Sequence, residues 1–99
     1  IMKELKLNNL TNNVIKLLKR NNSIQKDAKI DDNTFLNGAS SPFDSVSFIE
    51  FTTLIEEEVE KAEKKSFHII LNEIPKFKKG SGVIKIKDIK NYILKKSKK

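Results

Sequence analysis

The sequence predicts an all-α protein, a small antiparallel bundle of three to four helices with a long ordered loop between the first two. Two observations lead to this prediction. Apolar residues recur at spacings of three and four in three separate segments, which is the pattern of one buried helix face. Residues 21–44, between the first two segments, are so rich in Asn, Asp, Ser, Gly and Pro that they exclude a long regular element.

Each expected helix has its own apolar stripe. The first helix ends near Arg20, the second begins at Asp44-Ser45 just after Pro42, and the third follows the Gly-Ser-Gly of residues 80–82. The three stripes consist of Leu7, Leu10, Val14, Leu17 and Leu18; of Phe48, Phe51, Ile55 and Val59; and of Ile86, Ile89, Ile93 and Leu94.

Two connecting segments have their own patterns. Residues 67–74 are apolar enough to be buried, as a short helix or an extended piece that Pro75 ends, and residues 76–82 then form a basic loop. The long loop over residues 21–44 carries apolar side chains that can hold it against the core, which favours an ordered loop. These side chains are Ile24, Ile30, Phe35, Leu36 and Phe43.

Length and composition predict one domain spanning residues 1–99. Residues 1–2 are expected to be an artificial start, and residues 95–99 a disordered basic tail. The absence of cysteine excludes a disulfide framework and a cysteine nucleophile. No apolar run approaches the roughly 18 residues of a membrane span, so we expect a cytoplasmic protein.

The net charge of +7 conceals an uneven distribution. Acidic side chains gather in residues 44–63, where Lys61 is the only basic residue, whereas lysines dominate residues 64–99. An acidic helix in the middle of a basic chain is more informative than the total charge.

The most informative run is the Ser-Pro-Phe-Asp-Ser-Val of residues 41–46, which leads into the acidic second helix. By itself, Asp44-Ser45 is a common helix cap. Residues 32–38 upstream read Asp-Asn-Thr-Phe-Leu-Asn-Gly, and a Glu-Glu-Glu run at residues 56–58 lies near the far end of the helix. Together, residues 30–61 resemble the modification site of acyl carrier proteins, and a helix precedes and follows this region in the family's order.

The resemblance implies a function without catalysis of its own. Ser45 would be the attachment point of a 4′-phosphopantetheine arm, whose thiol carries acyl groups as thioesters. A separate phosphopantetheinyl transferase would attach the arm, and Asp44 would cap the helix and approach the metal of that transferase. Acyl-loading and acyl-transferring enzymes would be the other partners, and the carrier would act as a monomer. Gly38 would permit a tight turn in the preceding loop.

The second helix would also be the surface that partner enzymes bind. Val46 follows the attachment serine and would contact both partner and arm, and Glu50, Glu57 and Glu58 would meet basic patches on the partners. The alternative is an ordinary solvated helix face. Three departures from the family are Ser47 in place of an acidic residue, the basic 66–85 region and the basic chain as a whole. They favour a carrier of a specialised lipid or secondary-metabolite pathway over one of housekeeping fatty acid biosynthesis.

A second hypothesis is a basic, non-enzymatic interaction module that binds nucleic acid or an acidic protein partner. Phe77 and Tyr92 could supply stacking surfaces beside its lysines. The acidic helix and the single arginine, Arg20, disfavour nucleic acid. His68 lies among apolar residues and is expected to be a partly buried imidazole rather than a catalytic base or metal ligand. The candidate lysines are Lys76, Lys78, Lys79, Lys85, Lys87 and Lys90.

Overall fold

The structure of the protein is a computed structural model that describes residues 2–78 and 82–98. These residues form four α-helices and one 3-10 turn, and the all-α prediction is confirmed. No strand occurs in the described ranges, and the one isolated β-bridge pairs Phe35 with Lys85. The elements are α1 (Glu4–Arg20), α2 (Ser45–Glu63), η1 (Leu71–Glu73), α3 (Pro75–Lys78) and α4 (Ile86–Ser97).

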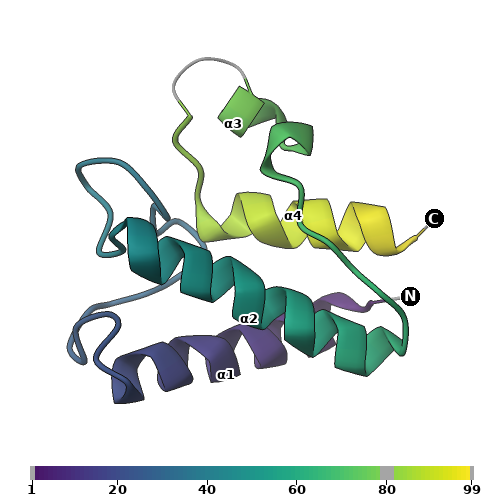
Figure 1. The fold of residues 1–99 in the computed structure, drawn as a ribbon, viewed down its shortest axis with the longest axis horizontal. Coiled ribbons are helices and arrows are strands. Elements are labelled where there is room, and N and C mark those ends of the chain that lie inside the picture. Colours follow the sequence, from purple (N-terminus) through teal and green to yellow (C-terminus); the bar gives the residue numbers. More distant parts are fainter. Residues whose placement is uncertain (1, 79–81, 99) are drawn as a thin grey trace.

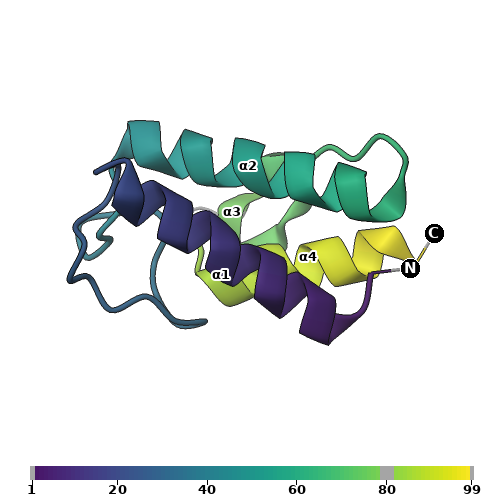
Figure 2. The same ribbon diagram turned by 90° about the horizontal axis from the view of Figure 1, so that it is seen from below.

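The three long helices do not all alternate in direction. Helix α1 runs antiparallel to α2, but α4 runs in the same sense as α2 (Figures 1 and 2). A fully antiparallel bundle was therefore a wrong expectation. The connection from α2 to α4 is long enough, and contains enough structure of its own in η1 and α3, to bring the chain back to the end where α2 begins.

The predicted stripes build most of the core, although Phe48 and Leu94 are half-buried rather than buried. Leu17 of the first stripe is only half-buried, and Ile15 is buried in its place, at 8% exposed. Ile15 faces the loop over residues 21–44, so α1 buries a wider face than one stripe against α2. The apolar side chains with 0 or 1% exposure come from every long helix and from both connections: Leu7, Leu18, Leu36, Phe51, Ile55, Val59, Ile84, Ile89 and Ile93.

The long loop is ordered, as predicted, because its apolar side chains are buried in the core and its backbone pairs with another segment. Ile24, Leu36 and Phe43 are buried in the core. The backbone of residues 32–36 pairs with residues 84–87 at the start of α4, through Leu36 N–H to Ile84 O and two similar hydrogen bonds. Gly38 has a φ of +89°, so the expected tight turn is present and requires a backbone conformation that favours glycine.

The segment after α2 differs from the prediction at Pro75. This proline does not end an element; it is the first residue of the short helix α3, so residues 76–78 are helical rather than part of a basic loop. Proline suits the first helical position, because its fixed φ is already helical and the N–H that it lacks would have no partner there. Residues 79–81 of the predicted loop lie outside the described residues.

The C-terminal end also differs from the expectation. Helix α4 continues through Ser97, so residues 95–97 are helical rather than a disordered tail. Ser97 is buried, and its hydroxyl accepts a hydrogen bond of 3.3 Å from the N–H of Met2, which is buried as well. This contact fixes the last turn of α4 against the start of the chain, and N- and C-terminal ends lie side by side in both views. Ile1 and Lys99 lie outside the described residues.

Across residues 2–78 and 82–98, none of the helices combines the length and the apolar character that crossing a membrane requires.

Candidate functional site

The start of α2 is fixed by a reciprocal cap. The carboxylate of Asp44 accepts the N–H of Ser47 at 2.8 Å, and the hydroxyl of Ser47 accepts the N–H of Asp44 at 2.9 Å. This is the capping-box arrangement, with serine in the place usually taken by Glu or Gln. Phe43, the residue before the cap, packs edge-on against Phe51 with ring centroids 5.6 Å apart. The helix therefore begins at Ser45, as the sequence predicts.

Ser45 is exposed at the first position of this 19-residue helix. The positive end of the helix dipole favours a negatively charged group at this position, by about 0.3–1 kcal/mol at an exposed site. No acidic residue occurs in the first turn of α2, so nothing within that turn opposes such a group. Hydrogen bonds from the backbone and side chain of Ser47 lower the pKa of Asp44 and keep the capping carboxylate ionised.

Ser47 has a different role from the one assigned by the sequence. From the sequence it is only a position that lacks the family's acidic residue, whereas in the structure its side chain is 1% exposed and serves the cap. The sequence signal for this role was available, because a side chain three residues after an N-cap is in the position that closes a capping box.

Two exposed apolar side chains lie beside Ser45. Val46, predicted to contact partners, is 65% exposed, and Ile49, which the sequence analysis did not single out, is 64% exposed. Residues three apart are neighbours on a helix surface, so these two form one apolar patch at the start of α2. Ile49 falls outside the buried stripe of α2, and this departure from the periodic pattern was the signal that could have identified it.

The three carboxylates predicted to meet partners have unequal environments. Glu57 is exposed, and Glu58 forms an ion pair of 3.3 Å with Lys61. Glu50 is half-buried and accepts a hydrogen bond of 3.3 Å from the hydroxyl of Ser23. Glu57 and Glu58 therefore present charge at the surface, whereas Glu50 also ties α2 to the end of α1.

Two other acidic residues of α2 are structural. Glu60 accepts the N–H of Phe67 at 2.9 Å, and Glu56 accepts the N–H of Ile69 at 2.6 Å. These bonds hold the segment after α2 in an extended course along the helix. This pairing could not be predicted from the sequence, because glutamates on a helix face are usually solvated.

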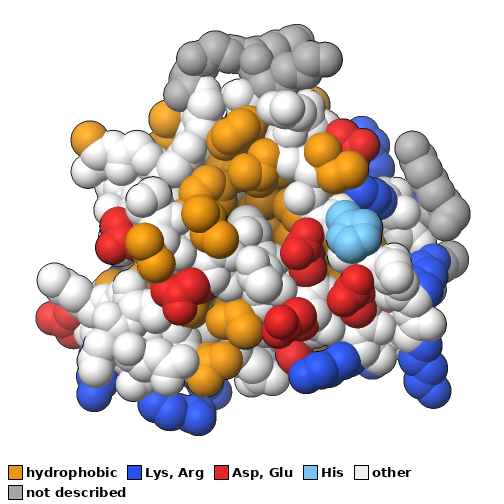
Figure 3. All heavy atoms as spheres, viewed as in Figure 1, with side chains coloured by type: hydrophobic (Ala, Val, Ile, Leu, Met, Phe, Trp, Pro, Cys, Tyr) orange, Lys and Arg blue, Asp and Glu red, His pale blue; other side chains and the backbone are white. Residues whose placement is uncertain are grey.

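Apolar side chains also gather in a hollow between α2 and α3 (Figure 3). The elements around it carry half-buried apolar side chains, which are Phe48, Leu54, Leu71 and Phe77. The hollow lies beside α2, the helix whose first turn carries the Val46–Ile49 patch.

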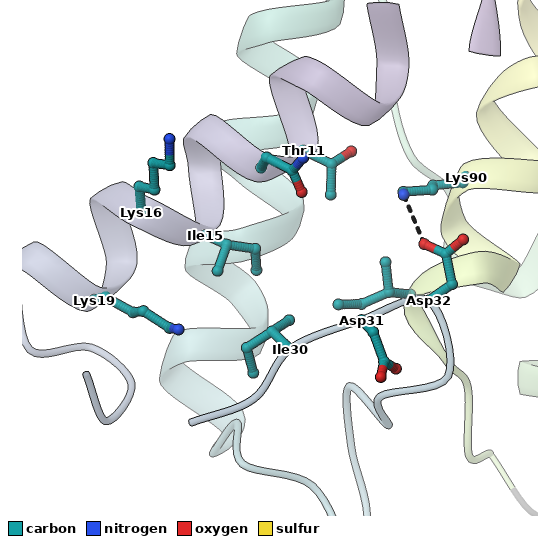
Figure 4. Close-up of a pocket in the computed structure, with 10 residues that line it drawn as sticks. Thr11, Ile15, Lys16, Lys19, Ile30, Asp31, Asp32 and Lys90 are labelled. Atoms are coloured by element: carbon teal, nitrogen blue, oxygen red, sulfur yellow. Dashed lines mark hydrogen bonds and ion pairs between the residues drawn. The ribbon is translucent and has the colours of Figure 1, made fainter. Parts of the chain in front are cut away.

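A separate pocket of about 270 Å³ lies between α1, the long loop and α4 (Figure 4). Ile15 and Ile30 face each other across it, and Lys90 at its edge bonds Asp32 at 2.7 Å and Asn8 at 2.9 Å. Lys90 is thus part of the structure that holds the loop to α4. The pocket includes none of the residues at the start of α2.

The environment of His68 differs from the one that the sequence predicts. His68 is exposed rather than partly buried, because the side chains on either side of it, Phe67 and Ile69, are the ones that face the core. The backbone carbonyl of His68 accepts a hydrogen bond of 2.7 Å from Lys96. No group of three or more His, Cys, Asp or Glu residues with a geometry that could hold a metal ion occurs among residues 2–78 and 82–98.

No protein-family model, curated protein or solved structure matches this chain. The resemblance to acyl carrier proteins therefore depends on residues 30–61 and on the geometry at the start of α2.

Proposed function

We propose that this protein is an acyl carrier protein that carries acyl intermediates as thioesters on a 4′-phosphopantetheine arm attached to Ser45. The observation that carries the proposal is the exposed hydroxyl of Ser45 at the start of α2, directly after the capping residue Asp44. The proposed protein has the acyl-carrier fold, acts in the cytoplasm as a monomer and catalyses no reaction itself.

Attachment of the arm requires only an accessible hydroxyl from the carrier. The Ser45 hydroxyl attacks the pyrophosphate of coenzyme A in the active site of a transferase, forms a phosphodiester and releases the nucleotide half of the coenzyme. The transferase supplies the base that takes the hydroxyl proton. The product phosphodiester is negatively charged and lies where the dipole of α2 stabilises it.

The arrangement around Ser45 supports the rest of the proposal. Val46 and Ile49 offer an apolar contact for partner enzymes beside the arm, and Glu57 and Glu58 offer charges for orienting them. The hollow between α2 and α3 is an apolar surface on which an attached acyl chain can fold back. The 66–85 region, which is longer and more basic than a minimal carrier needs, favours a specialised lipid or secondary-metabolite pathway.

The interaction-module hypothesis has less support. Lys90 is bound by Asp32 and Asn8, and Lys85 lies over the ring of Phe35 at 5.3 Å. Both lysines thus serve the contact between the loop and α4. Tyr92 donates its hydroxyl proton to Glu73 at 2.6 Å and is half-buried, so it is a poor stacking platform.

The test is enzymatic loading followed by intact mass measurement. Wild type, Ser45→Ala and Ser40→Ala are each incubated with coenzyme A and a broad-specificity phosphopantetheinyl transferase. Ser40 is an exposed serine of the same loop and serves as the matched control. The proposal predicts that wild type and Ser40→Ala each gain one phosphopantetheine and that Ser45→Ala gains none.

Two results would contradict it. A gain of one phosphopantetheine mass on Ser45→Ala would show that the arm is attached to another residue. Absence of any gain on folded wild type, with both the broad-specificity and the cognate transferase, would remove the carrier function.

A further inference from the structure

A second surface of the molecule has features that the proposed carrier site does not explain. A groove of about 480 Å³ runs between η1–α3 and α4 and includes no residue of α2. Its apolar lining includes Ile74, Pro75, Tyr92 and Leu94. On α4 it extends from Asp88 to Lys98, which is about 15 Å along the helix axis. An apolar groove of this length can receive about three turns of a partner helix.

The carboxylates of this groove are already occupied. Asp88 caps α4 by accepting the N–H of Lys85 at 2.8 Å, and it forms an ion pair of 3.4 Å with Lys76. Glu73 accepts the Tyr92 hydroxyl and forms an ion pair of 3.4 Å with Lys96. Neither acidic side chain is therefore available to balance further positive charge at the groove.

The lysines at the end of the groove remain uncompensated. Lys95 in the last turn of α4 and Lys98 directly after the helix are exposed, lie three residues apart, and form no ion pair within the described residues. The C-terminal end of α4 thus gives the apolar groove a positive end. A binding partner must bring apolar side chains for the floor and negative charge for this end.

We propose that the groove between η1–α3 and α4 is a docking site for an acidic amphipathic helix of a partner protein. The groove is open to solvent along its length, so a bound acyl chain would leave much of its apolar surface in water. A helix avoids this cost, because it buries one apolar face and keeps the opposite polar face in solvent. Acidic residues on the flank of such a helix meet Lys95 and Lys98.

The site is independent of the Ser45 modification, so the unmodified protein is sufficient for the test. The probe is a fluorescein-labelled helical peptide of about 14 residues, with leucines on one face and glutamates beside them. Amide chemical shifts of the isotope-labelled protein locate its binding site. The expected shifts are confined to residues 73–76 and 88–98, with the amides of α2 unchanged.

Affinity is compared by fluorescence anisotropy in two charge-reversal variants. Lys95→Glu/Lys98→Glu is expected to weaken binding about tenfold or more. The control, Lys16→Glu/Lys19→Glu, has the same three-residue spacing and the same change in net charge on α1, and it is expected to change affinity less than about twofold. Circular dichroism verifies that both variants remain helical.

Three outcomes would overturn the proposal. The first is a peptide that shifts no groove amide at the highest concentration. The second is an equal loss of affinity in both folded variants, which indicates a nonspecific effect of net charge. The third is a groove that responds to dodecanoate but not to the peptide, which identifies an acyl chain as the occupant.

Discussion

The backbone N–H of Asp44 donates to the hydroxyl of Ser47 at 2.9 Å, and the N–H of Ser47 donates back to the carboxylate of Asp44 at 2.8 Å. This reciprocal pair encloses Ser45 and Val46 between its two members. It therefore fixes where α2 begins and which hydroxyl stands at the exposed first position of the helix. The function that we propose depends on this fixed position, because a transferase must find one serine in one geometry.

Removing the cap is expected to destabilise the protein. Ser47→Ala leaves the N–H of Asp44 without its partner and should lower the free energy of unfolding by about 1 kcal/mol. Urea denaturation measures this change, with Ser66→Ala, an exposed serine outside any helix, as control. Loading of Ser45 by the transferase should also become slower, since the helix start frays. An unchanged denaturation midpoint in Ser47→Ala would show that the cap contributes nothing.

The pH dependence of stability should show how much the ionised Asp44 carboxylate contributes to the stability of the protein. Its pKa is lowered from 3.8 by the hydrogen bonds from Ser47. A lowered folded-state pKa gives stability that is present above the unfolded-state value and is lost as pH falls through the folded-state value. Asparagine caps a helix without titrating, so the stability of wild type relative to Asp44→Asn should fall on acidification below about pH 4.

Urea denaturation of both proteins near neutral pH and at about pH 3 measures this difference. A difference between wild type and Asp44→Asn that stays constant with pH would contradict the assigned role of the carboxylate.

Replacing a glutamate that holds the segment after α2 should destabilise the protein more than replacing its exposed neighbour. Glu56→Ala removes the acceptor of the Ile69 N–H and should cost about 1–1.5 kcal/mol. Hydrogen exchange at the amides of Phe67 and Ile69 should also become faster, as the segment opens locally. Glu57→Ala is the matched control on the exposed face. Equal exchange in the two variants would mean that the hydrogen bond does not restrain the segment.

Any side chain introduced at Gly38 should lower the free energy of unfolding. Its φ of +89° strains any L-residue, and an added Cβ would lie 3.4 Å from a methyl group of Val83. Gly38→Ala should therefore destabilise the protein by about 1 kcal/mol. Thermal or urea unfolding measures this loss, with Ser40→Ala as control in the same loop. A Gly38→Ala variant as stable as wild type would show that the turn adapts freely.

The sequence allowed the long helices to be predicted because their signals are local. Apolar spacing locates α1, α2 and α4, and Pro42 with Asp44 marks the start of α2 within one residue. The exposure of Ser45 and Val46 follows from the same helical periodicity, since both fall outside the buried stripe.

The features that escaped prediction depend on residues far apart in the chain. The pairing of residues 32–36 with 84–87 and the contact of Met2 with Ser97 join segments whose proximity no local pattern reveals. The parallel course of α4 and α2 depends on the route of the intervening chain. Pro75 was misread for another reason, since proline both ends helices and begins them.

The most direct test of the proposed function is the location of the arm on the loaded protein. Tandem mass spectrometry of the peptide that contains Ser40, Ser41, Ser45 and Ser47 resolves which hydroxyl carries the phosphopantetheine. The proposal predicts the arm on Ser45 alone, because Ser47 is buried in the cap and the Ser41 hydroxyl is bonded to the carbonyl of Phe35 at 2.7 Å. An arm on another serine, or a folded protein that accepts no arm from its cognate transferase, would contradict it.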